Sequence, residues 1–168
     1  MSRMDLLLKV YSNKKLSVFL KSVSYITVFF SVAVYTIVLY KAFSLSYPTL
    51  FKCILTSGGA FALVSVYRRI VNAPRPYEIY QFYDVLPKNK KGRSFPGRHA
   101  FSVFTVATLS LCISPVVFAI ALILGVALCI CRVLLGIHFI KDVSVGALLG
   151  IFSGAMSLYL SGLTAFIT

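Results

Sequence analysis

Long apolar runs separated by short polar breaks dominate the chain, and they predict an all-α, polytopic membrane helical bundle. A run of about 20 apolar residues crosses the hydrocarbon core of a bilayer as a helix. Helices are expected because, inside lipid, only helices and closed barrels satisfy their own backbone. The pattern predicts about five transmembrane helices, with bounds at 16–43, 49–70, 99–113, 116–135 and 142 to the C-terminus.

The breaks between these runs carry helix stop signals. Pro74 and Pro76 end the second span, because a residue before proline avoids the helical region. Residues 71–98 form the only long polar connection, which is first amphipathic and then basic. Residues 1–15 mix leucines with basic residues, which is typical of a helix lying in the membrane interface, with a frayed tail as the alternative.

Composition supports the membrane assignment. Of the 168 residues, 59% are hydrophobic and 12% charged, whereas soluble domains have about 45–50% and about 25%. We therefore expect one membrane-embedded domain over 1–168. The net charge of +13 favours anionic membrane lipids and phosphate ligands as partners, and the chain carries no nucleic-acid-binding motif.

Charge placement predicts the orientation. With five spans, the basic N-terminal segment, the 71–98 connection and the 132–142 connection share one face of the membrane. The positive-inside rule makes that face cytoplasmic. The chain is thus expected to be an integral multi-pass cell membrane protein whose functional site faces the cytoplasm.

Small residues and cysteines add two further expectations. Gly146, Gly150 and Gly154 recur every four residues, which suits tight helix packing within the chain or a homodimer through this face. Gly58 and Gly59 also allow close packing. The four cysteines lie in apolar runs without a CxxC spacing, so we expect no zinc or redox site.

Two arginines form a first polar cluster at a membrane boundary. Arg68 lies at the end of the second span, and Arg75 follows seven residues later, directly before a proline. Guanidinium groups present planar forks that match phosphate oxygens. The alternative is an ordinary basic stop after a membrane span.

The second cluster is the segment Ser94-Phe-Pro-Gly-Arg-His99, directly before the third apolar run. Free N–H groups at a helix start bind anions, so Gly97 and Arg98 are candidate phosphate-binding residues. His99 can donate a proton to a leaving oxygen. The alternative is a loop with a surface histidine.

The third cluster contains Arg132, His138 and Asp142. His138 and Asp142 are four residues apart and would share a face of a helix, where Asp142 holds one ring nitrogen and leaves the other basic. The alternative is a basic loop followed by an N-capping aspartate.

The three clusters together predict a phosphoryl-transfer site that needs no metal and no cofactor. The arginines neutralise the phosphate and the charge of its transition state. His138 attacks phosphorus to form a phospho-histidine. His99 protonates the leaving oxygen and then activates water.

The same blocks resemble the type-2 phosphatidic acid phosphatase superfamily, which also includes vanadium haloperoxidases. Its signature reads Lys/Arg-x6-Arg-Pro, then Pro-Ser-Gly-His, then Ser-Arg-x5-His-x3-Asp. The first block matches from Arg68 to Pro76, and the third matches from Arg132 to Asp142 with Cys131 in place of the serine.

The resemblance implies a helical membrane bundle and a lipid phosphatase. It implies that His138 is the nucleophile, Asp142 its orienting partner and His99 the general acid. It also implies that the phosphate ligands are Arg68, Arg75 and Arg132.

The second block departs from the signature, because Gly97 and Arg98 replace the family's Ser-Gly. The lost hydroxyl removes one hydrogen bond to phosphate, about 1.5–3 kcal/mol for a charged acceptor. Arg98 either supplies a replacement charge or points to lipid headgroups.

The leading hypothesis is therefore an integral-membrane lipid phosphatase. Its candidate substrates are phosphatidic acid, phosphatidylglycerophosphate and polyprenyl phosphates or diphosphates. The alternative is a phospholipid-binding or transport protein of the same fold with weakened catalysis. A vanadate-dependent oxidase ranks last.

Overall fold

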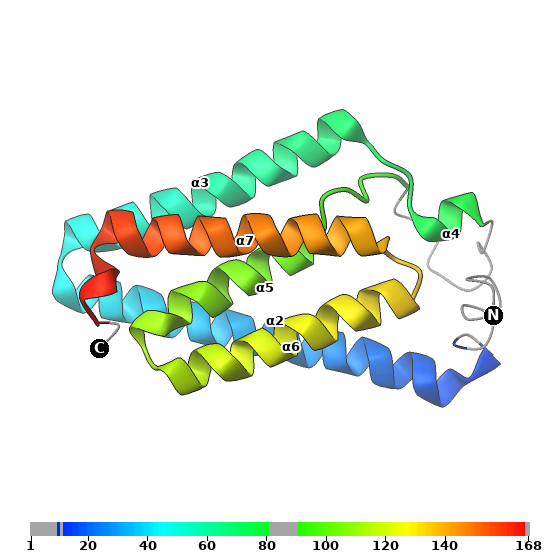
Figure 1. Cartoon of the computed structure of the whole chain (residues 1–168), viewed down its shortest axis with the longest axis horizontal. Helices are drawn as coiled ribbons and strands as arrows, with labels where there is room; N and C mark the ends of the chain where they lie inside the picture. The colour runs from blue at the N-terminus through cyan, green and yellow to red at the C-terminus, as the bar shows by residue number, and fades with distance from the viewer. Residues whose placement is uncertain (1–9, 11, 81–90, 167–168) are drawn as a thin grey trace.

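The computed structural model describes Val10 and residues 12–80 and 91–166. Five helices of 12 residues or more form the bundle in these residues, and no strand occurs among them (Figure 1). The elements are α2 (Lys14–Leu45), α3 (Tyr47–Val71), α4 (Pro76–Ile79), α5 (Arg98–Leu109), η1 (Ser110–Cys112), α6 (Pro115–Leu134), α7 (Ile140–Ser161) and η2 (Leu163–Phe166).

Side-chain caps define where the outer helices begin. The Asn13 side chain accepts from the backbone N–H of Leu16 at 3.2 Å, which caps α2. Ser46 caps α3 and Ser114 caps α6, each with a proline in the first turn of the helix that follows. These caps satisfy N–H groups that have no partner inside a helix.

The helices α2, α3, α5, α6 and α7 alternate in direction along the chain (Figure 1). The start of α2 lies at the same end of the bundle as α4, and the end of α7 lies at the opposite end. This is the arrangement that five successive antiparallel helices produce, so the predicted helical membrane bundle is confirmed.

The third predicted span has a different role from the other four. Helix α5 has 12 residues, about 18 Å at 1.5 Å per residue, whereas the hydrocarbon core is about 30 Å thick. It packs against α2, α3, α6 and α7, and nearly all its side chains from Ala100 to Leu109 are buried. Within the described residues, four helices are long and apolar enough to cross a membrane, and α5 is the core that they surround.

The glycine stripe of α7 is the surface on which α5 packs. A Cβ at Gly146 would meet the carbonyl oxygen of Gly97, and one at Gly150 would meet that of Phe101. A Cβ at Gly154 would lie 2.6 Å from Cβ of Thr108. The stripe therefore packs within the chain. A homodimer stays a prediction and would need another surface.

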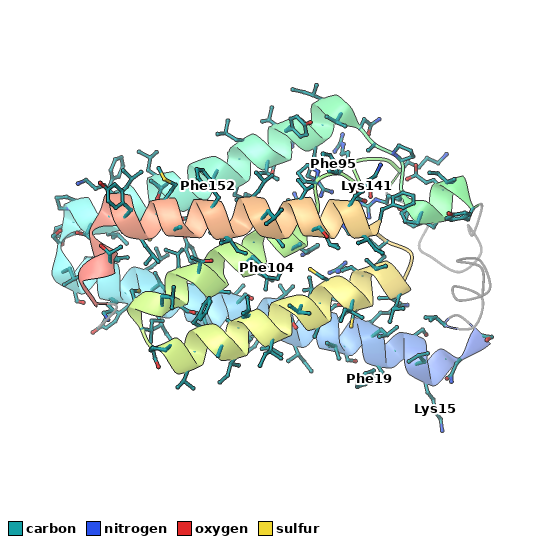
Figure 2. The ribbon with its side chains drawn as sticks, in the orientation of Figure 1. Lys15, Phe19, Phe95, Phe104, Lys141 and Phe152 are labelled. Atoms are coloured by element: carbon teal, nitrogen blue, oxygen red, sulfur yellow. The ribbon has the colours of Figure 1, made fainter. Side chains whose placement is uncertain are left out.

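The outer faces of the bundle are apolar. Figure 2 shows side chains covering them, among which Phe19 and Phe152 are more than half exposed. Gly58 and Gly59 of α3 face open space, with no atom within 4 Å of a Cβ built at either, so the close packing expected of this pair is wrong. The predicted interfacial helix at residues 1–15 and the lysines at 88 and 90 fall largely outside the described residues.

Candidate active site

All eight predicted site residues lie at one end of the bundle, at helix ends or in the loops that join them (Figure 1). They come from the last turn of α3 (Arg68), the N-cap of α4 (Arg75), the N-cap and first turn of α5 (Gly97, Arg98, His99), the last turn of α6 (Arg132), the α6–α7 loop (His138) and the first turn of α7 (Asp142). Figure 2 places Phe95 and Lys141 at this same end.

Arg68 holds the loop that precedes α5. Only 8% of this residue is exposed, and its guanidinium donates from Nη1 to the carbonyl of Pro96 and from Nη2 to that of Arg93. Two of its five N–H donors are thereby used. Among the described residues, its other N–H groups have no acceptor, so they are available to bind an anion beside the loop.

The 91–94 segment is hydrogen-bonded to the segment that contains the α3–α4 connection and α4. Arg75 donates from Nε to the Gly92 carbonyl at 2.9 Å, and the Gly92 N–H donates to the Glu78 carboxylate at 2.5 Å. The N–H of Ser94 donates to the Ala73 carbonyl at 2.9 Å. The first two sequence clusters are therefore joined by backbone contacts.

The six-residue spacing between Arg132 and His138 follows from the way α6 ends. Gly136 has φ +63°, and its N–H donates to the carbonyl of Val133, while the N–H of Ile137 donates to that of Arg132. These two bonds form a Schellman motif, which favours glycine at the left-handed position. The N–H of His138 also donates to the Arg132 carbonyl at 3.3 Å, so the histidine folds back over the helix end that carries the arginine.

His138 and Asp142 meet in a turn and do not share a helix face, which corrects the expectation from their spacing. Helix α7 begins at Ile140, after His138, and Asp142 caps it by accepting from the N–H of Phe139 at 2.9 Å. His138 Nδ1 lies 3.6 Å from Asp142 Oδ2. The paired residues are almost fully buried, with 3% of His138 and none of Asp142 exposed.

Ser94 bridges this pair. Its hydroxyl donates to Oδ2 of Asp142 and lies 3.3 Å from Nδ1 of His138. Because the Ser94 hydroxyl donates its proton in the hydrogen bond to the carboxylate, its oxygen can accept a hydrogen bond from Nδ1–H of His138. We infer that Nδ1 carries the ring proton, which leaves a lone pair on Nε2.

The surroundings of His138 favour its neutral form. Burial lowers the pKa of His138 below its usual value, and the charges of Arg75 and Arg68 act in the same direction, while Asp142 opposes them. A neutral imidazole has the lone pair that a nucleophile needs. The neutral form of His138 is therefore the one expected at neutral pH.

His99 has a more open environment. It is half-buried in the first turn of α5, and no hydrogen bond of its side chain occurs among the described residues. Burial lowers the pKa of His99 from its usual value to about 3, and the charges of Arg132, Arg98 and Arg68 act in the same direction. His99 is therefore neutral in the empty site, and an anion bound among these arginines would raise its pKa and favour the protonated form.

Gly97 is required by the packing between α5 and α7. Its N–H donates to the Asp142 carbonyl at 2.7 Å, and a Cβ at this position would lie 2.9 Å from that oxygen. A serine here would force the backbone of α7 to move. The departure from the family signature is therefore part of a close contact between backbones.

The start of α5 and Arg132 offer unused donors. In the part of the chain that the structure describes, the N–H groups of Arg98, His99 and Ala100 have no acceptor, and neither has the buried Nε of Arg132. Phosphate oxygens fit such donors at a helix start. No group of three or more His, Cys, Asp or Glu gathers in the described ranges.

A cavity of about 570 Å³ opens beside His99, between α2, α3 and α5. Its lining is mainly apolar and includes Val32, Gly58 and Phe61. Arg98 and His99 also line it. The site is therefore continuous with a groove on the side of the bundle, which we call the α2–α3 groove.

Fold and site together define a membrane-embedded phosphatase. Arginines and N–H donors surround a buried imidazole at one end of an apolar bundle. The sequence profile of the PAP2 superfamily matches residues 49–164, and the chain belongs to this family.

Two solved structures share the fold. The crystal structure of LpxE from Aquifex aeolicus is 26% identical, with a TM-score of 0.63, and the match covers 93% of this chain and 94% of that one. A PAP2-type phosphatidylglycerolphosphate phosphatase from Bacillus subtilis is 20% identical, with a TM-score of 0.67, and coverage is 99% and 86%. A search of curated protein sequences gave no significant match.

Sequence reasoning missed the role of Ser94. Ser94 lies 44 residues before His138 and 48 before Asp142, so its distance along the chain does not predict the contact. The available signal was that Ser94 belongs to the second block, two residues before Pro96.

Proposed function

We propose that this protein is an integral-membrane lipid phosphatase that works through a phospho-histidine intermediate. The observation that carries the proposal is the buried His138, whose Nδ1 faces Ser94 and Asp142 while arginine charges act on its ring. An imidazole oriented in this way, beside cationic groups, suits attack on a phosphate.

In the first step, the phosphate lies among Arg68, Arg75 and Arg132, which offset its charge. Nε2 of His138 attacks phosphorus, and the bond from phosphorus to the lipid oxygen breaks. The N–H groups at the start of α5 bind the equatorial oxygens. They offer a substitute for the hydroxyl that is lost at Gly97.

His99 acts on the leaving oxygen. It supplies a proton as the lipid alcohol departs, and it then takes a proton from the water that cleaves the phospho-histidine. Its position on the wall of the α2–α3 groove directs the leaving group toward the apolar side of the site. The products are a lipid alcohol, or a lipid monophosphate from a diphosphate, and inorganic phosphate.

The α2–α3 groove holds the hydrocarbon tail of the substrate. It is continuous with His99 and is apolar over most of its lining. Phosphatidic acid, phosphatidylglycerophosphate and polyprenyl phosphates or diphosphates all combine such a tail with a terminal phosphate. The activity named for the Bacillus subtilis structure makes phosphatidylglycerophosphate one reasonable substrate to test.

The site faces the cytoplasm in this proposal. Its end of the bundle carries most of the described basic residues outside the catalytic clusters, namely Lys14, Lys15, Lys21, Arg69, Lys91, Arg93 and Lys141. The opposite end has Lys41 and Lys52. The positive-inside rule supports this orientation. Labelling of Lys141→Cys by an impermeant reagent in intact cells, above the level of the unsubstituted protein, would contradict it.

The direct test is release of inorganic phosphate from phosphatidic acid in mixed micelles by the purified protein, with excess chelator. The proposed chemistry uses histidines and arginines, so we expect turnover to persist in chelator. Binding of the lipid without turnover, on all the candidate lipids, would instead favour the lipid-binding or transport alternative. Loss of turnover in chelator alone would reject the metal-free mechanism.

Two adjacent glycines test the placement of the tail. Gly58 lines the α2–α3 groove, whereas Gly59 lines a cavity of about 460 Å³ between α3 and α7, whose lining has no charged residue. Neither glycine has an atom within 4 Å of a built Cβ, so at both positions a leucine side chain begins in open space.

We expect Gly58→Leu to lower kcat/KM for long-chain phosphatidic acid by about 10²-fold, since a displacement of about 1 Å costs this much. Gly59→Leu is the matched control and should stay near wild type. Dihexanoyl phosphatidic acid should be much less affected by either change. The reverse pattern would assign the tail to the α3–α7 cavity.

A further inference from the structure

Arg98 is a cation at the groove that the phosphate chemistry does not use. It is exposed in the first turn of α5, and its guanidinium lies over the ring of Phe61 at 5.6 Å. Among the described residues that line the α2–α3 groove, it is the only Lys, Arg, Asp or Glu. No hydrogen bond or ion pair of its side chain occurs within the described ranges.

The contact with Phe61 places this charge on the groove side of the site. Phe61 belongs to α3 and lines the same groove, so its ring holds the guanidinium across the gap between α3 and α5. A cation is attracted to the face of an aromatic ring, which favours this position of the guanidinium. Arg68, by contrast, points to the loop carbonyls of Pro96 and Arg93.

The side on which Arg98 lies is the side of the leaving group. In an in-line displacement the attacking and leaving atoms lie on opposite sides of phosphorus. His138 is buried away from the groove and His99 lines it. If these two residues act as proposed, the leaving oxygen lies beside His99, and Arg98 is its neighbour in the chain.

We propose that Arg98 makes the site selective for lipid diphosphates by binding the phosphate that departs with the lipid, an inference that rests on the proposed function. His138 Nε2 forms a bond to the terminal phosphorus, and the bond from that phosphorus to the bridging oxygen breaks. The bridging oxygen keeps the electron pair and takes the proton of His99. The lipid monophosphate leaves with its new charge beside Arg98, and water releases the terminal phosphate from His138.

Two other roles for Arg98 predict different results. A ligand of the transferred phosphate would serve monophosphates and diphosphates equally. A contact to bilayer headgroups would affect neither substrate in detergent. Only a group that binds the leaving phosphate changes the activity on diphosphates and leaves the activity on monophosphates nearly unchanged.

The test compares farnesyl diphosphate with farnesyl phosphate, which share one tail, in detergent micelles. We expect the wild-type protein to prefer the diphosphate in kcat/KM. Arg98→Ala should lower kcat/KM for the diphosphate by about 10- to 100-fold, as expected for a lost charged hydrogen bond, and should lower that for the monophosphate much less. Arg98→Lys should recover part of the loss, since it keeps the charge without the planar fork.

Arg69→Ala is the matched control, because Arg69 is an exposed arginine at the same end and has no part in the proposed site. It should leave the ratio of the two rates unchanged. An equal loss on both substrates in Arg98→Ala, or no loss on either, would overturn the role of Arg98. Wild-type turnover of the monophosphate without preference for the diphosphate rejects this inference alone. Absence of phosphate release from either compound and from phosphatidic acid rejects the proposed function itself.

Discussion

The two histidines of the site are held in opposite ways. His138 is buried, and its Nδ1 faces Ser94 at 3.3 Å and Asp142 at 3.6 Å. His99 lies in the first turn of a helix, lines the groove, and has no side-chain hydrogen bond among the described residues. A nucleophile benefits from a fixed direction of attack, whereas a general acid must follow an oxygen that moves away. The difference in restraint therefore matches the difference in proposed role.

Removing the restrained histidine should have the largest effect. We expect His138→Ala to lower kcat by about 10⁴-fold or more, because no other group in the site can take its place as nucleophile. The loss should be the same for phosphatidic acid and for p-nitrophenyl phosphate. Phosphate release measures it, and size-exclusion chromatography confirms the fold. A variant with full activity would show that the nucleophile is another residue.

Removing the unrestrained histidine should have a smaller effect that depends on the substrate. We expect His99→Ala to lower kcat for phosphatidic acid by about 10²- to 10³-fold, the usual contribution of a general acid. The loss should be much smaller for formation of the phospho-histidine from p-nitrophenyl phosphate, whose leaving group departs without a proton. A rapid-mix measurement of nitrophenol release isolates this step. Equal losses on both substrates would mean that His99 binds phosphate and does not transfer a proton.

Loosening the restraint on His138 should have the smallest effect of the three. Ser94→Ala removes the hydroxyl between Asp142 and His138, and we expect kcat to fall by about 10- to 100-fold with little change in KM. Ser144→Ala is the control, since Ser144 is exposed in the first turns of α7. A change confined to KM would mean that Ser94 contacts the substrate and does not orient the imidazole.

Local signals predicted much of this molecule. The apolar runs located the helices to within a few residues, because proline and serine mark their ends in the chain itself. The first and third blocks located the arginines and the His138–Asp142 pair. Both signals act over short distances along the chain.

The remaining features depend on contacts between distant segments. Spacing alone placed His138 on a helix, whereas the turn at Gly136 puts it before α7. The bridge from Ser94 joins segments more than 40 residues apart, and the glycine stripe of α7 is covered by α5. Apolar content predicted a helix at α5 but did not predict that the four longer helices surround it. A buried core helix and a membrane span have the same apolar composition.

The short central helix has a consequence for biogenesis. A 12-residue segment is too short to remain in a bilayer alone, and α5 buries its apolar surface against α6 and α7, which are made after it. During synthesis, α5 must therefore stay at the translocon or at the membrane surface until its later neighbours arrive. Asp142 lies in the first turn of α7, so a nascent chain halted before α7 has no assembled catalytic centre.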